Sequence, residues 1–205
     1  MRILVMGGGV VGVTAAYELL KDGHEIVLVE QNEAAGIETS WGNAGMVAPG
    51  HSFAWSSPHA PMILLKSLVM RDQSLRFKPS LDPALWTWSL KFLAQCTKSR
   101  SEYNTIRKHR LATYSQSILH ETLSALDISY DRVDRGILYF YRTQGRLEAG
   151  IDHMQVLARS GQKIEVLDRK QVLALEPSLA QVGHKIAGGI YCPTDETGDC
   201  NKFTT

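Results

Sequence analysis

Three consecutive glycines near the start of the chain constrain its fold more than any other feature. They follow a short apolar run, Ile3 to Met6, and precede residues 10–21, whose apolar positions recur with helical spacing. Gly23 ends this segment, and a second apolar run follows at residues 25–29. This order predicts a strand, a tight turn, a helix and a second strand, the βαβ unit that opens a Rossmann-like domain.

Gly7, Gly9 and Gly12 have the spacing G-x-G-x-x-G, in which each glycine has a mechanical purpose. The first permits a sharp turn, the second lets backbone approach a pyrophosphate, and the third lets the helix pack closely on the strand. Unpaired N–H groups and the helix dipole favour an anion there. Glu30 follows the second strand, where a carboxylate can bind both hydroxyls of an adenosine ribose and repel a 2′-phosphate. The pattern predicts a dinucleotide site and leaves NAD and FAD open.

Charge and cysteine usage exclude several other classes. The formal net charge is +1 and the pI is about 7.8, which argues against a dedicated nucleic-acid binder. The 3 cysteines have no C-x-x-C spacing and the 7 histidines are scattered, so we expect free thiols and no metal site. The first strand starts close to Met1, leaving no room for a secretory signal, and no apolar run approaches the ~20 residues of a membrane span. We therefore expect a location inside the cell.

A second distinctive stretch, G-I-E-T-S-W-G-N-A-G-M-V-A-P-G, occupies residues 36–50. It is rich in turn formers and can be an ordinary surface loop. Its composition also suits a segment that lies close to a flat ligand, because Gly42 and Ala44 add little bulk and Ser40 can form hydrogen bonds. Both interpretations stay open on composition alone.

The glycine-rich helix start, Glu30 and E-T-S-W-G-N-A-G-M together resemble the FAD-dependent D-amino-acid oxidase superfamily, and within it the bacterial D-amino-acid dehydrogenases (small subunit). The likeness continues through L-D-P-A-L-W-T-W and D-R-G-I-L-Y-F-Y-R-T to the closing D-E-T-G-D-C-N-K-F-T-T, so it covers all 205 residues. The resemblance implies FAD as the cofactor instead of a nicotinamide.

By position, the resemblance implies FAD contacts along three segments. It places the pyrophosphate over the glycine turn, the adenosine ribose on Glu30, and the second stretch beneath the pyrophosphate toward the flavin ring. Trp41 receives no role. The implied cofactor-binding residues are Gly7, Gly8, Gly9, Val10, Val11, Gly12, Glu30, Gln31, Ser40, Asn43, Ala44, Gly45 and Met46.

The middle of the chain predicts an α+β substrate domain. Asp82 and Pro83 open a helix whose face of Leu85, Trp88, Phe92 and Cys96 we expect in a core. A long helix follows from residue 101 to about 126, with Leu111, Tyr114, Ile118, Leu119, Leu123 and Leu126 at helical spacing. The apolar stretch at residues 62–70 is either a buried helix or a patch that contacts a membrane. The basic residues 107–110 form either a solvated helix face or a site that attracts anionic lipid head groups.

Strand and cap signals complete this middle region. Asp134, Arg135 and Gly136 form a turn signal between I-S-Y-D-R-V and I-L-Y-F-Y-R-T, which predicts two antiparallel strands. The sequence predicts a helix over residues 143–159, whose inward side chains are Leu147, Ile151, Met154 and Leu157. A strand follows, then a short helix with a capping box at Asp168 and Gln171, and a last strand before residue 193. We assign residues 1–60 to the FAD domain, 61–192 to the substrate domain and 193–205 to a segment returning to the FAD domain.

Only one βαβ unit is visible, whereas a doubly wound sheet needs several parallel strands. We therefore expect an incomplete FAD domain, a chain matching the N-terminal half of such an enzyme, and a missing C-terminal half or partner chain. No catalytic residue is assigned, because the resemblance places the carboxylate-binding Arg and Tyr in that other half; Arg135, Tyr139 and Tyr141 are interpreted as structural.

The resemblance implies oxidative deamination of a D-amino acid to a 2-oxo acid and ammonia, with electrons passed to a quinone-type acceptor. Peripheral contact with the inner face of the cell membrane stays open as an alternative to a purely cytoplasmic location. Three further hypotheses remain. One is another amine-oxidising flavoprotein, such as a glycine oxidase or hydroxyproline dehydrogenase. Another is a non-catalytic remnant or subunit that needs a partner chain, and the last is an NAD-dependent enzyme.

Overall fold

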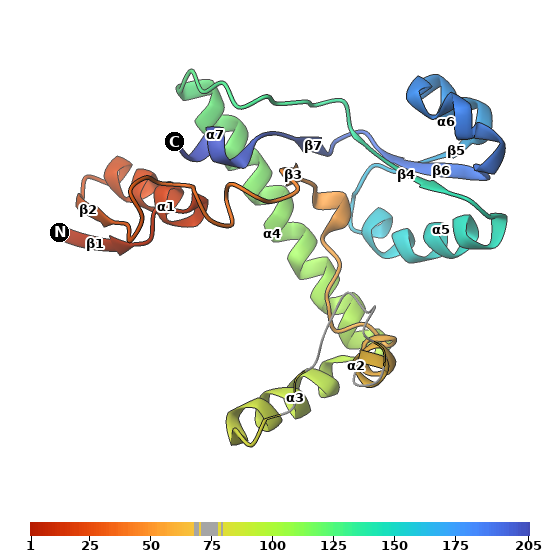
Figure 1. Cartoon of the computed structure of the whole chain (residues 1–205), viewed down its shortest axis with the longest axis horizontal. Helices are drawn as coiled ribbons and strands as arrows, with labels where there is room; N and C mark the ends of the chain where they lie inside the picture. The colour runs from red at the N-terminus through yellow and green to blue at the C-terminus, as the bar shows by residue number, and fades with distance from the viewer. Residues whose placement is uncertain (68–69, 71–77, 79) are drawn as a thin grey trace. The chain divides into compact units, whose positions relative to one another are not determined.

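The computed structural model describes residues 1–67, 70, 78 and 80–205 (Figure 1). They divide into two compact units, each made of separate stretches of the chain. Unit 1 comprises Met1–Ala48, Gln116–Tyr139 and Tyr191–Thr205, and unit 2 comprises Pro49–Ser115 and Phe140–Ile190. The three functional domains assigned from the sequence, residues 1–60, 61–192 and 193–205, stay a prediction, because the two compact units are not a test of function.

Unit 1 opens with the predicted βαβ unit. Strand β1 (Arg2–Met6) pairs in parallel with β2 (Glu25–Val29), and helix α1 (Val10–Lys21) connects them. The expected order of strand, turn, helix and strand is confirmed. Among the described residues this sheet has two strands, so the larger Rossmann-like sheet stays a prediction.

A second pairing in unit 1 joins distant parts of the sequence. Strand β3 (Met46–Val47) runs antiparallel to β7 (Glu196–Thr197), with Met46 opposite Thr197. Val133 also forms an antiparallel bridge with Thr197. Helix α7 (Cys200–Thr204) follows, and the Asp199 side chain accepts a hydrogen bond from the Lys202 N–H at its start. These contacts tie three separate stretches of the chain together.

The predicted hairpin between I-S-Y-D-R-V and I-L-Y-F-Y-R-T is wrong. Strand β4 (Ile137–Tyr141) instead neighbours β6 (Gly188–Cys192), in a three-stranded sheet of order β4-β6-β5 with β5 at Glu165–Asp168. Gly136 has a φ of +73° and lies under the Tyr191 ring. The Tyr191 hydroxyl donates to the Arg135 carbonyl at 2.7 Å. The chain therefore bends at Arg135 and Gly136 without forming a hairpin, and β4 neighbours β6.

Helix α5 (Gln144–Arg159) packs on this sheet through close contacts with glycine. A Cβ added to Gly150 would lie 2.4 Å from the Tyr141 hydroxyl, and one added to Gly188 would lie 2.8 Å from Leu147. The capping box of Asp168 and Gln171 at α6 (Arg169–Leu175) is confirmed, and a 3-10 helix, η2 (Pro177–Lys185), follows. The apolar side chains of unit 2 with the least exposure are Leu147, Met154, Leu157, Val172, Ile186 and Ile190.

The long helix α4 (Lys98–Ala125) buries polar side chains instead of the expected apolar ones. Leu111 is 65% exposed, whereas His109 is 4% exposed. The two His109 ring nitrogens lie 3.0 Å from the Ser160 hydroxyl and 3.1 Å from the Gln162 carbonyl oxygen. Of the apolar residues at helical spacing, Leu111 and Tyr114 are exposed, whereas Ile118, Leu119, Leu123 and Leu126 are half-buried. The fully buried positions of α4 are polar: Thr105, His109 and Gln116. Of the basic residues 107–110, Arg107, Lys108 and Arg110 are exposed, as a solvated face requires, and His109 is buried.

The remaining helical pieces are η1 (Pro49–His51), α2 (Ala60–Ser67) and α3 (Pro83–Gln95). The predicted cap is present, since Asp82 accepts from the Ala84 N–H at 2.8 Å. The predicted buried face of α3 is only partly correct: Cys96 is buried, but Trp88 is 56% exposed. Most of the predicted apolar stretch beyond residue 67 lies outside the described residues. No helix in the described part of the chain is long and apolar enough to cross a bilayer.

Candidate functional site

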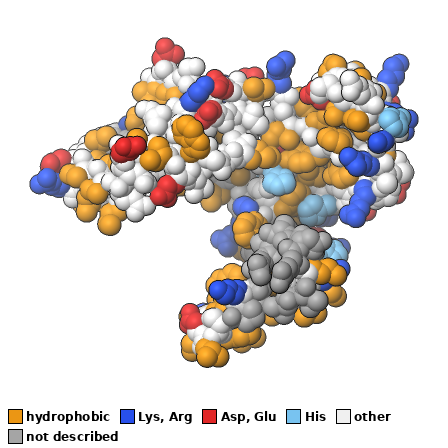
Figure 2. All heavy atoms as spheres, in the orientation of Figure 1, with side chains coloured by type: hydrophobic (Ala, Val, Ile, Leu, Met, Phe, Trp, Pro, Cys, Tyr) orange, Lys and Arg blue, Asp and Glu red, His pale blue; other side chains and the backbone are white. Residues whose placement is uncertain are grey.

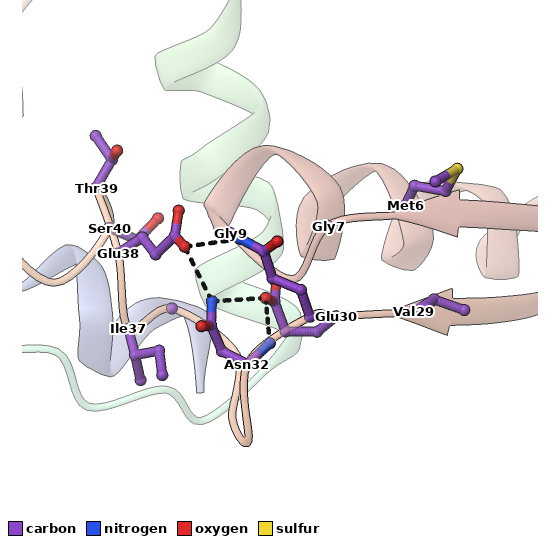
Figure 3. Close-up of a pocket in the computed structure, with 12 residues that line it drawn as sticks. Met6, Gly7, Gly9, Val29, Glu30, Asn32, Ile37, Glu38, Thr39 and Ser40 are labelled. Atoms are coloured by element: carbon purple, nitrogen blue, oxygen red, sulfur yellow. Dashed lines mark hydrogen bonds between the residues drawn. The ribbon is translucent and has the colours of Figure 1, made fainter.

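The glycine turn, the end of β2 and the first part of the second stretch together line a pocket of about 380 Å³ in unit 1 (Figure 3). This volume lies within the range that small-molecule sites in proteins occupy. The pocket contains five of the residues that the sequence pointed to, and seven that it did not. Its lining residues are Met6, Gly7, Gly9, Val29, Glu30, Gln31, Asn32, Gly36, Ile37, Glu38, Thr39 and Ser40.

The glycine turn has the geometry that the spacing predicted. Gly7 has a φ of +104°, a backbone conformation that glycine adopts without strain. A Cβ on Gly12 would lie 1.9 Å from the Gly7 carbonyl oxygen, so only glycine allows the helix to begin this close to the strand. A Cβ on Gly7 would meet nothing within 4 Å. The turn therefore presents open backbone on its pocket side.

Backbone donors are available at the start of α1. Gly9 is the N-cap and provides no side chain to satisfy the first turn. Among the described residues, the N–H groups of Gly9, Val11 and Gly12 have no hydrogen-bond acceptor. The Val11 side chain is 79% exposed. Free N–H groups at a helix start form an anion site without any charged side chain.

Glu30 holds the glycine turn from the end of β2. One carboxylate oxygen accepts from the Gly8 N–H at 2.5 Å, and the other accepts from the Asn32 N–H at 2.9 Å. These backbone donors, Asn32 first and then Gly8, lower the pKa of the Glu30 carboxyl below its ordinary value. The carboxylate is ionised at neutral pH. Its Oε1 atom accepts from both the backbone N–H and the side-chain amide of Asn32, whereas Oε2 accepts from the Gly8 N–H and keeps a lone pair for a ribose hydroxyl.

Ser40 lies on the opposite side of the pocket. Its hydroxyl accepts from the Val10 N–H at 2.9 Å, and the residue is 7% exposed. Ser40 thus supplies, from a loop 30 residues away, the helix cap that Gly9 lacks. The sequence pointed to this serine as a cofactor contact, and the structure gives it a second task in positioning the loop.

Asn43 to Met46 do not line the pocket. The Asn43 side chain accepts from the Gly45 N–H at 2.6 Å, and Met46 pairs with Thr197 in the β3–β7 ladder. A Cβ on Gly45 would lie 2.1 Å from the Gly198 carbonyl oxygen. Ala44 is exposed between them. In this structure the segment is anchored on β7, so contacts of these four residues with a cofactor stay a prediction.

Sequence reasoning missed Asn32 and Glu38. The Asn32 amide nitrogen donates to Glu30 at 2.8 Å and to Glu38 at 3.1 Å (Figure 3). The Gln31 amide donates to the same Glu38 oxygen at 2.9 Å. Asn32 follows Glu30 by two residues, so its N–H and side-chain amide can both reach the Glu30 carboxylate, whereas no local signal identifies Glu38.

The lowered pKa of Glu30 predicts an acid-sensitive contribution to stability. Because the folded-state pKa is below the ordinary value of 4.5, this contribution is present above that value and is lost as the pH falls through the folded pKa. We expect Glu30→Gln to flatten the acid limb of the stability curve. Urea unfolding at pH 7 and below pH 4.5 measures this change. Glu33→Gln, an exposed acid on the same loop, is the matched control, and an equal acid limb in both variants would contradict the assignment.

Comparisons with known proteins cover the whole of this chain. The family model described as "FAD dependent oxidoreductase" (DAO) matches residues 2–205. The chain is 44% identical over 203 residues to D-amino acid dehydrogenase 2 of Mesorhizobium japonicum, covering 99% of this chain and 49% of that protein. It is 43% identical over 204 residues to D-amino acid dehydrogenase of Azorhizobium caulinodans, covering 100% and 49%. The chain thus spans about half the length of these relatives.

The fold is similar to a solved structure of glycine oxidase from Geobacillus kaustophilus. The TM-score is 0.60 at 20% sequence identity, and the match covers 99% of this chain and 42% of that one. At this identity the similarity concerns the fold alone. It nevertheless spans the mixed helices and strands of both units.

Proposed function

Because this chain belongs to the DAO family of FAD dependent oxidoreductases, we propose that it forms the adenosine and pyrophosphate part of the FAD site in an enzyme that oxidises D-amino acids to 2-oxo acids and ammonia. The family makes FAD the cofactor, and the NAD-dependent alternative is set aside. The relatives named D-amino acid dehydrogenase support the substrate class.

One observation carries the proposal for the cofactor: Gly7 of the glycine turn, Gly9 with its free N–H at the helix start, and an ionised Glu30 line one pocket. The residues fit a dinucleotide, since the pocket side of Gly7 is open and Gly12 admits no Cβ. Glu30 would accept hydrogen bonds from the ribose, and the N–H groups of Gly9 and Val11 would donate to the pyrophosphate. Ser40 would fix the loop that covers the helix start.

Bound FAD would accept a hydride from the Cα of the amino acid, and hydrolysis of the resulting imine would release the 2-oxo acid and ammonia. The described residues bind and orient the nucleotide end. No pocket residue is a cation that could bind the substrate carboxylate, so we propose that the carboxylate-binding residues lie outside the pocket described. This proposal agrees with a chain that spans about half of its relatives.

The decisive experiment uses the full 205-residue chain dialysed with FAD. Retained visible absorbance, with bleaching by a D-amino acid under anaerobic conditions, supports both cofactor and substrate. Retention without bleaching supports the FAD site and leaves the substrate step to residues beyond this chain. Absence of FAD binding contradicts the proposed site. Bleaching by glycine or hydroxyproline in place of larger D-amino acids favours the related amine oxidases.

A partner chain is the second candidate, and a specific observation favours it. The β1–β2 sheet leaves apolar side chains open to solvent, with Leu4 58% and Met6 83% exposed. Large exposed apolar side chains on a two-stranded sheet favour pairing with further strands. Concentration-dependent association, measured by light scattering, tests whether this surface is covered by another chain.

We further propose a quinone-type acceptor and contact with the inner face of the cell membrane, with helix α3 as the contact. None of its side chains is buried in the described structure, and Trp88 and Leu90 are 56% and 69% exposed. Figure 2 shows hydrophobic side chains gathered on the surface of this helical region. Exposed Trp and Leu beside Lys91 suit the interface of a bilayer.

Substitution of Trp88 and Leu90 by serine is therefore expected to reduce co-sedimentation with anionic vesicles about tenfold, because burial of two large apolar side chains is lost. Trp55→Ser is the matched control, since Trp55 is 75% exposed but lies outside α3. Equal loss in both variants, or no vesicle binding by the unaltered chain, would contradict α3 as the membrane contact.

A further inference from the structure

The pocket has two walls that come from separate segments of the same loop. One wall contains Glu30, Gln31 and Asn32, and the other contains residues 36–40. The second wall is fixed at both ends on the glycine turn: the Gly36 N–H donates to the Gly8 carbonyl at 2.9 Å, and Ser40 caps α1. Between these ends, Ile37, Glu38 and Thr39 are exposed.

Glu38 joins the two walls. A single carboxylate oxygen accepts from the Gln31 amide at 2.9 Å and from the Asn32 amide at 3.1 Å (Figure 3). In the part of the chain that the structure describes, these two bonds are the side-chain hydrogen bonds that connect one wall to the other. The same Asn32 nitrogen donates to Glu30 at 2.8 Å. Glu38 is therefore connected to the ribose-binding candidate through one shared amide.

We propose that Glu38 is a positioning residue of the nucleotide pocket: it holds Gln31 and Asn32 against the loop of residues 37–39 and thereby orients Glu30 for an adenosine ribose. The inference rests on the proposed FAD site and deepens it. The glycine fingerprint does not contain this residue, because the contact depends on how the loop folds back on the end of β2.

The chemistry of the contact separates positioning from simple charge. Both recorded bonds are accepted by an oxygen, so the carbonyl oxygen of a glutamine can replace them, whereas alanine cannot. If Glu38 positions the wall, Glu38→Gln retains nucleotide binding and Glu38→Ala loses it. If only the negative charge mattered, the two variants would behave alike.

The test measures dissociation constants of the full chain for FAD and for ADP, at a temperature where circular dichroism shows each variant folded. Glu38→Ala is expected to weaken both ligands about tenfold, the loss of two hydrogen bonds to a charged group in a partly open site. Glu38→Gln is expected to stay within about threefold of the unaltered chain. Glu33→Ala, the matched exposed acid, should leave both constants unchanged.

A second variant tests the same contact from the side of the donors. Replacing Gln31 and Asn32 together by alanine removes the donors while keeping Glu38, and should weaken ADP as much as Glu38→Ala does. Equal affinities for Glu38→Ala and the unaltered chain would overturn the inference and leave the FAD site intact. A chain that binds FAD but not ADP would also overturn it, because the pocket would not hold the adenosine end. Failure of the unaltered chain to bind either ligand would overturn the site and the inference together.

Discussion

Replacing Gly12 by alanine is expected to destabilise unit 1 by roughly 3 kcal/mol and to abolish retention of FAD. The added Cβ would lie 1.9 Å from the Gly7 carbonyl oxygen, an atom of the backbone that cannot rotate away. In an exposed helix the same change would stabilise by about 1 kcal/mol, so the sign of the effect depends on this contact. Relief requires the helix to move away from the strand, and that movement displaces the N–H groups at the start of α1, including that of Gly9, which lines the pocket.

Denaturant midpoints and the visible absorbance of bound FAD measure the two parts of this prediction. Gly42→Ala is the matched control, because a Cβ there meets nothing within 4 Å and the residue lies in the same unit. The control should leave stability within about 0.5 kcal/mol. A Gly12→Ala chain with an unchanged midpoint would show that the close approach of helix and strand is not required.

Replacing Arg132 by methionine is expected to cost about 3 kcal/mol, because it leaves a buried carboxylate without its cation. Glu196 is 2% exposed, and its two oxygens accept from the Arg132 guanidinium at 2.5 Å and contact the His120 ring at 2.6 Å. The remaining contacts of Glu196, with His120 and with the Gln116 amide at 3.3 Å, place the expected cost at the lower end of the range for broken buried ion pairs. Methionine keeps most of the apolar stem, which isolates the loss of charge.

A double-mutant cycle with Glu196→Gln separates the buried carboxylate from other causes. If the orphaned carboxylate carries the penalty, the double variant should be more stable than Arg132→Met alone, since no charge remains buried. Chemical denaturation at pH 7 supplies the four free energies of unfolding. Lys21→Ala, which removes one half of an exposed ion pair with Glu18, should change little. Additive losses in the cycle would contradict the role given to Glu196.

Several local elements followed directly from the sequence. Helix α1, strand β2 and the caps at Asp82 and Asp168 have the expected bounds or hydrogen bonds. These features depend on residues within one or two turns of each other. Side-chain caps and glycine conformations act over that distance, so a single sequence contains the whole cause.

The expectations that failed depend on residues far apart in the chain. The buried face of α4 is polar because His109 meets Ser160 and Gln162, 51 and 53 residues away. Strand β4 neighbours β6, and Tyr191 of β6 packs on Gly136 just before β4; local periodicity does not identify this pairing. Periodicity identifies an apolar stripe but does not identify the polar groups that another element offers to a helix.

The candidate site divides in the same way. The glycine turn and the carboxylate at Glu30 could be predicted from the sequence, because a short fingerprint fixes the backbone path and its donors. The family could also be predicted, because the resemblance extends along the whole chain. Only the tertiary structure decided that Ser40 caps α1, that Glu38 joins the pocket walls, and that Met46 pairs with Thr197. Each of those contacts joins residues that are separated by a loop in the sequence. Which polar groups meet is decided by hydrogen-bond geometry after the helices and strands have packed.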